Sequence, residues 1–216
     1  MVIQVNFEVD GKIYDVVVNK KSGTRGLYIR VKPDLKIYVT TSKWSPNLIV
    51  RNALEKNYTK IVKMIKTQEI INKNNEGFYY LGKKYEVVNT TSGTVRLDGD
   101  KVYIKEGYDI DLWYKKEAKK LFQEKLDENY EKFTRDIPKP KLRIRRMTSR
   151  WGVCNIKTHV ITLNLKLIER DEKYLNYVIV HELSHLIHGD HSNRFWNLVE
   201  ENYPNCKKIA KEMKLF

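Results

Sequence analysis

The residues best suited to chemistry lie together in one short stretch, between positions 181 and 191. His181 and His185 are four residues apart, so on a helix they stand one turn apart on the same face, and their imidazoles can meet one metal ion. Glu182 follows the first histidine and can act as general base on a water at that metal. Residues 175–180 are largely apolar, which predicts a buried helix, where two histidines without a role would be costly to desolvate. The His-Glu-x-x-His pattern therefore predicts the metal site of a zinc-dependent hydrolase.

A third ligand is expected just beyond this helix. His191 lies six residues after His185 and follows Gly189, a glycine that predicts the end of the helix. The chain can reverse there and bring His191 back over the metal, from a direction that completes a tetrahedron. Three protein ligands and one open position are typical of a catalytic zinc site. His188, almost one helical turn after His185, is the competing choice; without that role it is an ordinary histidine near the C-terminal end of the helix dipole.

The spacing of the three histidines equals that of the metzincin motif His-Glu-x-x-His-x-x-Gly-x-x-His. Two features exclude that family. His188 occupies the glycine position, and the only later methionine, Met213, stands in a predicted terminal helix rather than in a Met-turn. The remaining histidine, His159, is expected on a strand with a structural role. All five histidines lie between positions 159 and 191, so an incidental cluster is a poor explanation for the pattern.

The elements that precede this stretch are predicted from hydrophobic periodicity. Apolar and polar residues alternate over residues 3–9, and the hairpin dipeptide Asp10-Gly11 follows, which predicts the start of a small antiparallel sheet. Ser45 is a good helix cap with a proline after it. We expect helices at residues 46–68 and 110–133, and strands at residues 3–9, 12–19, 27–31, 35–40, 78–81, 85–88, 95–97 and 102–104.

The segment 136–140, with two prolines, is the clearest connector in the chain. Beyond it we expect strands at residues 142–147 and 159–163 with a loop at 151–157 between them. A helix at 172–188 then carries the two paired histidines, and Ser192 caps a short final helix. The predicted fold class is α+β. Its predicted parts are an antiparallel, β-rich N-terminal region with two long helices (residues 1–136) and a smaller region that holds the site (residues 137–216).

The composition indicates which class of partner the protein could bind. Of 216 residues, 41 are lysine or arginine and 27 are acidic, a formal charge of +14, which raises the odds of an anionic partner such as nucleic acid. Alternate residues of a strand face opposite ways, so at most half of residues 141–146 can share one face. No aromatic residue interleaves with these charges, so any binding would be independent of base sequence. The densest basic cluster is Lys139, Lys141, Arg143, Arg145, Arg146 and Arg150.

The chain also carries signs of its compartment. No apolar run approaches the roughly 20 residues that span a bilayer, and the alternating residues 1–6 are unlike a signal peptide. Cys154 and Cys206 are too few for a disulfide framework and lack the paired spacing of a zinc site. We expect each to be a small buried hydrophobe. The sequence thus predicts a cytoplasmic protein.

Four motifs give the chain a family resemblance. Residues 145–154 (Arg-Arg-Met-Thr-Ser-Arg-Trp-Gly-Val-Cys), 161–164 (Ile-Thr-Leu-Asn), 177–186 around the paired histidines, and His191-Ser192-x-x-Phe195-Trp196 occur in this order in the YgjP-like metallopeptidases. These are bacterial relatives of the SprT-like and WLM zinc proteases. The upstream Leu-Gly-Lys-Lys-Tyr at 81–85 is also similar. Val153 replaces the serine of the family pattern, and a proline usual near position 171 is absent.

The resemblance implies a zincin-like metallopeptidase domain over residues 137–216, with zinc on His181, His185 and His191. Arg150 and Trp151 are candidates to line the site; a surface arginine and a packed tryptophan are the alternatives. The leading hypothesis is a zinc metallopeptidase that cleaves a peptide or amide bond, with Glu182 as general base. A non-proteolytic hydrolase of a small molecule would use the same residues. A nucleic-acid-binding module, or an SprT-like protease recruited by nucleic acid, is the third hypothesis.

Overall fold

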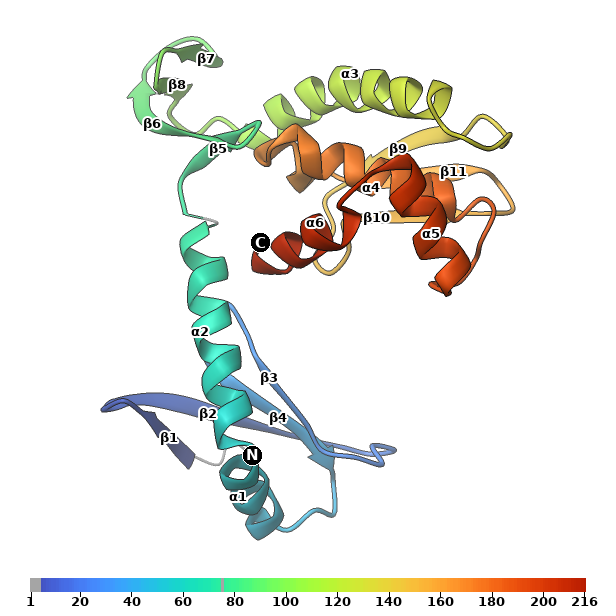
Figure 1. Cartoon of the computed structure of the whole chain (residues 1–216). Coiled ribbons are helices and arrows are strands. Elements are labelled where there is room, and N and C mark those ends of the chain that lie inside the picture. The colour runs from blue at the N-terminus through green and yellow to red at the C-terminus, as the bar shows by residue number, and fades with distance from the viewer. Residues whose placement is uncertain (1–4, 75) are drawn as a thin grey trace. The chain divides into compact units, whose positions relative to one another are not determined.

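The computed structural model describes residues 5–74 and 76–216 and shows a mixed α+β fold (Figure 1). Contacts divide the chain into two compact units: one runs up to Glu76 and includes Lys214–Phe216, and the other is Gly77–Met213. The predicted boundary at residues 136 and 137 lies inside the second unit. The assignment of residues 137–216 as a separate catalytic domain therefore stays a prediction.

The first unit is a four-stranded sheet with two helices on one face. Its strand order is β1-β2-β4-β3, and Asp10 and Gly11 form the predicted two-residue hairpin turn, both with positive φ. Apolar residues of the inner face, such as Ile37 and Val39, pack under Ile61 and Ile65 of the second helix. Residues 1–4, where the first predicted strand starts, lie outside the described part. The elements are β1 (Val5–Val9), β2 (Lys12–Lys21), β3 (Tyr28–Val31), β4 (Ile37–Ser42), α1 (Asn47–Lys56) and α2 (Tyr58–Asn74).

The prediction of a wholly antiparallel sheet was wrong. β3 and β4 form the expected hairpin, but it is β4 that pairs with β2, and this pairing is parallel. The physical reason is burial: Ile37 and Val39 of β4 are fully buried, so β4 takes the central position, whereas β3 carries exposed Tyr28 and Arg30 and stays at the edge. The same arrangement recurs in the second unit, where β6 pairs with β8 and β9 with β11 in parallel.

The second unit contains two sheets, of strand order β5-β6-β8-β7 and β10-β11-β9, with the helices packed around the latter. Asp109 caps α3 by accepting a hydrogen bond from the backbone N–H of Asp111; the sequence left the choice between these two aspartates open. The elements are β5 (Phe78–Tyr80), β6 (Lys83–Thr90), β7 (Val95–Asp98), β8 (Lys101–Lys105), α3 (Ile110–Glu131), β9 (Lys141–Arg145), β10 (Gly152–Asn155), β11 (Val160–Asn164), the 3-10 helix η1 (Leu165–Glu169), α4 (Glu172–Ser184), α5 (Asn193–Asn202) and α6 (Cys206–Glu212). The 3-10 helix η2 (Met213–Leu215) follows, and its last two residues belong to the first unit.

Helix α4 lies at the centre of this unit. It contacts α3, α5, α6, β10, β11 and η1, and Figure 1 shows it in orange beside α3. Nine of its thirteen residues are buried, so it is apolar on nearly every side, as the run before His181 predicts. The described residues contain no helix that is long and apolar enough to cross a membrane.

Three element boundaries differ from the sequence prediction. The first long helix breaks at Asn57, whose side chain donates to the Ala53 carbonyl and ends α1. Residues 151–157, expected as a loop, contain β10, because that segment pairs with β11. Helix α4 ends at Ser184 rather than His188, since its last turn tightens: the N–H groups of Leu186 and Ile187 donate to carbonyls three residues earlier.

Candidate metal centre

Helix α4 presents His181 and His185 on successive turns. Their ring centroids are 5.0 Å apart, the separation expected of side chains four residues apart on one face. Buried neighbours on the helix, including Leu175 and Ile179, fix α4 against the rest of the unit. The rigid helix therefore sets the position of two of the three histidines.

His191 reaches the other two from the loop between α4 and α5. Its Nε2 lies 3.2 Å from Nε2 of His181, and one ligand nitrogen from each of the three histidines falls within 4.8 Å of the others. His188, the competing residue, contributes its backbone carbonyl instead, which lies 3.0 Å from His185 Nδ1. The early end of α4 makes this possible, because the chain can turn between Ser184 and His191.

The separation of the imidazoles matches a metal site. A tetrahedral zinc with Zn–N bonds of about 2.0–2.1 Å holds two ligand nitrogens about 3.3 Å apart, and the His181–His191 nitrogens are 3.2 Å apart. Burial and the neighbouring histidines lower the pKa of His181 to about 3, and burial lowers that of His185. Both rings are therefore neutral near pH 7, the state in which imidazole binds a metal.

The ring orientation of His185 is set by a second hydrogen bond. Nδ1 of His185 donates to the His188 carbonyl, which leaves Nε2 with a free lone pair. Nδ1 of His181 is buried and has no hydrogen-bond partner among the described residues. Since Nε2 of His181 faces His191, the unpartnered Nδ1 carries the proton in the tautomer that suits a metal ligand. The donor set thus fits a zinc-like cation.

An aromatic residue packs against all three imidazoles. Phe195 of α5 is fully buried, and its ring centroid lies 4.9, 4.5 and 4.9 Å from those of His181, His185 and His191. Trp196 adds a second aromatic wall beside His181 and His191. These contacts restrict the ring rotations of the histidines. The sequence analysis noted both aromatics in the motif at 191–196, but it did not predict their contact with the histidines.

Glu182 is enclosed on the side of β10. It is 5% exposed, and the backbone N–H of Cys154 donates to its carboxylate. A Cβ placed on Gly152 would lie 2.5 Å from Oε1 of Glu182, so only glycine allows the strand to approach this closely. Burial raises the pKa of Glu182 to about 8, with Arg150 and the Cys154 N–H opposing the shift. A pKa close to neutral pH suits a group that both accepts and returns a proton.

Asn164 holds the segment that leads into β10. Its Nδ2 donates to the carbonyls of Met147 and Arg150 at 2.9 and 2.7 Å, and its Oδ1 accepts from the N–H groups of Met147 and Lys166, both at 3.1 Å. The side chain is 3% exposed, and its amide is fully used. Asn164 therefore fixes residues 147–151, and with them the start of the strand that contacts Glu182.

The other residues singled out in the sequence take varied positions. Arg150 is exposed, and its charge acts on Glu182; Trp151 is partly buried and its carbonyl accepts from the backbone of Asn164. Cys154 is partly rather than fully buried, and burial followed by the charge of Glu182 raises the pKa of its thiol to about 12. His159 was expected in a strand, but it lies in the preceding turn with φ of 52°.

The basic cluster at 139–150 is only partly available. Lys139 pairs with Asp127 at 3.1 Å, and Arg146 pairs with Asp111 and Glu169. On the edge strand β9, the exposed positions alternate with partly buried ones. Three cations of the cluster share the exposed face of β9: Lys141, Arg143 and Arg145.

Comparison with known proteins places this chain in a family. No curated protein matches it. Two crystal structures of metallopeptidase zymogens are similar over part of the chain. Abylysin of Pyrococcus abyssi has 27% identity and a TM-score of 0.39, with 43% of this chain and 90% of that chain covered. Jannalysin of Methanocaldococcus jannaschii has 23% identity and a TM-score of 0.38, with 43% and 92% covered.

The match to a family model is far more extensive. The YgjP-like metallopeptidase domain matches residues 25–216, a range that includes the three clustered histidines, Glu182 and the strands beside them. The chain therefore belongs to the YgjP-like family, and it is a metallopeptidase, a hydrolase that uses a metal ion.

Proposed function

We propose that this metallopeptidase uses zinc, bound by His181, His185 and His191 in a zincin-like domain, with Glu182 as general base. The observation that carries the proposal is the 3.2 Å separation of two imidazole nitrogens, with the third histidine within 4.8 Å. Two imidazole nitrogens at this distance gain little from one another, but they suit a shared cation. Three ligands leave the fourth position open, which is the arrangement of a catalytic site.

A zinc ion bound there supplies a Lewis acid that polarises the scissile carbonyl and lowers the pKa of water to about 7. The chain supplies the rest. Phe195 and Trp196 exclude water from one side of the imidazoles. Glu182 accepts the proton of the attacking water on its carboxylate and returns it to the leaving amine, so that no net proton is consumed by the residue. The Cys154 N–H and the backbone at Gly152 keep this carboxylate in one place.

A hydrolase of a small amide or phosphate ester would need the same four residues, so the substrate class is part of the proposal. The family description favours a peptide bond. We propose a cytoplasmic location as well, which the two free cysteines support.

The metal assignment is tested by zinc content. Purified protein should carry about one zinc per chain, and His191→Ala should lose most of it, because one of three protein ligands is gone. His188→Ala is the matched control and should keep its zinc, since only the backbone of His188 contacts the cluster. Retention of zinc by the first variant together with its loss from the second would reverse the choice of third ligand.

The general-base assignment is tested by Glu182→Gln. The amide cannot accept the proton of water, so turnover of quenched fluorescent peptides should fall by at least about a hundredfold, while zinc content stays at the level of the parent. Full turnover by this variant would exclude the assignment. Cleavage of small esters or amides without any cleavage of peptides would favour the small-molecule hydrolase.

A further inference from the structure

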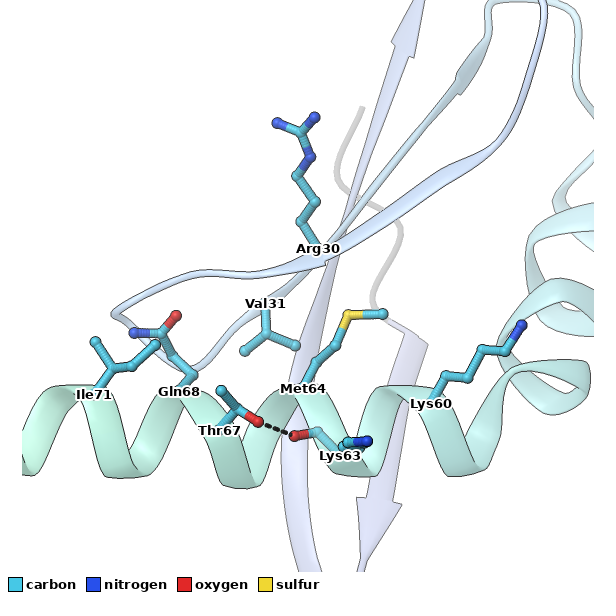
Figure 2. Close-up of a pocket in the computed structure, with 8 residues that line it drawn as sticks. All are labelled: Arg30, Val31, Lys60, Lys63, Met64, Thr67, Gln68 and Ile71. Carbon is cyan, nitrogen blue, oxygen red and sulfur yellow. Dashed lines mark hydrogen bonds between the residues drawn. The ribbon is translucent and has the colours of Figure 1, made fainter. Parts of the chain in front are cut away.

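A second binding feature lies in the first unit, along the open edge of its sheet. There, a groove of about 540 Å³ runs between β3 and one flank of α2. Figure 2 shows Val31 pointing from the strand toward the helix, with Met64 rising from α2 to meet it, and Arg30 pointing away. The size falls within the range of ligand sites in proteins. The residues that line it are Arg30, Val31, Lys60, Lys63, Met64, Thr67, Gln68 and Ile71.

The groove combines an apolar floor with a cationic rim. Val31 and Met64 form the floor, and Lys60 and Lys63 of α2 supply two positive charges, without a carboxylate among the lining residues. The single acidic residue of α2, Glu69, is bound elsewhere: it accepts from Tyr14 at 3.1 Å and pairs with Lys12 at 3.4 Å. The local charge therefore complements an anionic partner with apolar side chains.

The backbone of β3 offers hydrogen bonds along the same groove. β3 is an edge strand, and the N–H of Lys32 donates to the Lys36 carbonyl at the start of its hairpin. Because hydrogen-bonded pairs alternate in an antiparallel ladder, Arg30 and Tyr28 direct their backbone groups at β4. Ile29 and Val31 therefore direct theirs away from the sheet, where another strand can pair with them.

We propose that this groove binds an extended acidic polypeptide segment, which adds a strand to β3 and lays alternate apolar side chains against Val31 and Met64. From Lys60 to Ile71, α2 is about 16 Å long at 1.5 Å per residue, the length of about five residues of a strand. Main-chain pairing gives affinity in this mode, and the side-chain contacts give specificity. The groove recruits protein substrates of the peptidase, and this role rests on the proposed function. The binding of a peptide in the groove does not depend on that function.

The opposite face of the sheet is less suited to a single-stranded nucleic acid. Asn19, Lys21, Tyr28 and Arg30 line a hollow there, but the ring of Tyr38 is covered by the Lys32 ammonium at 3.7 Å, and its hydroxyl donates to Asp34 at 2.7 Å. Base stacking needs an open aromatic face. Tyr38 therefore offers no open ring face on the side of Lys32, and the groove is the better site for a partner.

The experiment uses the full chain and a labelled, end-blocked hexapeptide that alternates glutamate and valine, with binding read by fluorescence anisotropy. Lys60→Glu combined with Lys63→Glu should weaken binding at least about tenfold. Lys116→Glu with Lys119→Glu, two exposed positions of α3 at the same spacing, is the matched control for net charge. It should leave the affinity within about twofold, because these lysines lie outside the groove.

Two changes test the backbone pairing. N-methylation of alternate peptide residues removes donors without changing charge, and one of the two methylation registers should weaken binding at least about tenfold. Val31→Pro removes one of the two outward N–H donors of β3, at an edge position where proline is tolerated. It should weaken binding similarly, with the fold retained by circular dichroism. Equal affinity for both methylated peptides, or tighter binding of an oligonucleotide of equal charge, would reduce the groove to an electrostatic patch and overturn the proposal.

The two proposals fail separately. Glu182→Gln should bind the hexapeptide as the parent does, because the residue lies in the second unit. A chain that binds the peptide and hydrolyses nothing would retain the groove and refute the proposed function. The opposite result is a chain that cleaves peptides but binds the hexapeptide no better than the Lys60 and Lys63 variant does. It would retain the proposed function and refute the groove.

Discussion

Gly152→Ala should disable the site without removing a ligand. The added Cβ would lie 2.5, 2.7 and 2.8 Å from Oε1, Cγ and Cδ of Glu182, whereas ordinary contacts begin near 3.4 Å. The carboxyl group must therefore shift by about 1 Å. It has little space for this, since the side chain is 5% exposed and the Cys154 N–H holds it. Gly152 does not adopt positive φ, so the steric contact is the whole effect.

Two magnitudes follow from this shift. Overpacking a close-fitted interior costs about 1–3 kcal/mol of folding free energy. Displacing a catalytic group by about 1 Å can lower the rate about a hundredfold, which equals about 2.7 kcal/mol of transition-state stabilisation. Zinc content should stay at the level of the parent, because the three atoms nearest to the added Cβ all belong to Glu182.

The assay combines urea unfolding, zinc content and turnover of quenched peptides. Gly26→Ala is the matched control, since a Cβ there would meet only the Tyr28 ring, at 3.5 Å. In a Glu182→Ala background, Gly152→Ala should lose most of its destabilising effect, because the clashing partner is absent. Parent-like stability and turnover of Gly152→Ala, or an equal destabilisation in both backgrounds, would refute the reasoning.

Three further outcomes are expected. Asn164→Ala leaves two carbonyls and two N–H groups without their partner, so we expect it to lower the free energy of unfolding by about 3 kcal/mol or more, measured by urea; Asn164→Asp should also destabilise, because its second oxygen would face the Met147 and Arg150 carbonyls. Phe195→Leu loosens the packing of the three imidazoles, and zinc affinity by competition with a chelator should fall about tenfold, whereas unchanged affinity would make Phe195 a packing residue only. If the exposed face of β9 binds duplex DNA through its three cations, log affinity should fall with log salt at a slope of about −2.7, and no binding at low salt would leave the charge without that role.

The sequence alone determined the part of the site that depends on local geometry. A helix places residues four apart on one face whatever surrounds it, so the spacing of His181 and His185 predicted their proximity. The turn at Asp10 was predictable because it depends on adjacent residues, and the cap of α3 was narrowed to Asp109 or Asp111. The choice of His191 over His188 rested on the direction of approach, and the geometry agrees, although its role as a ligand stays a prediction.

The tertiary structure decided everything that depends on residues distant in the chain. Strand order was one such feature: periodicity shows that β2 and β4 are strands, but the competition among strands for the buried centre of the sheet makes their pairing parallel. The contact of Gly152 with Glu182, the four hydrogen bonds of Asn164, and the packing of Phe195 on three histidines were not predictable from spacing. Each of these contacts joins segments that are separated in the sequence. The geometry of such a contact is fixed only when the complete core has packed.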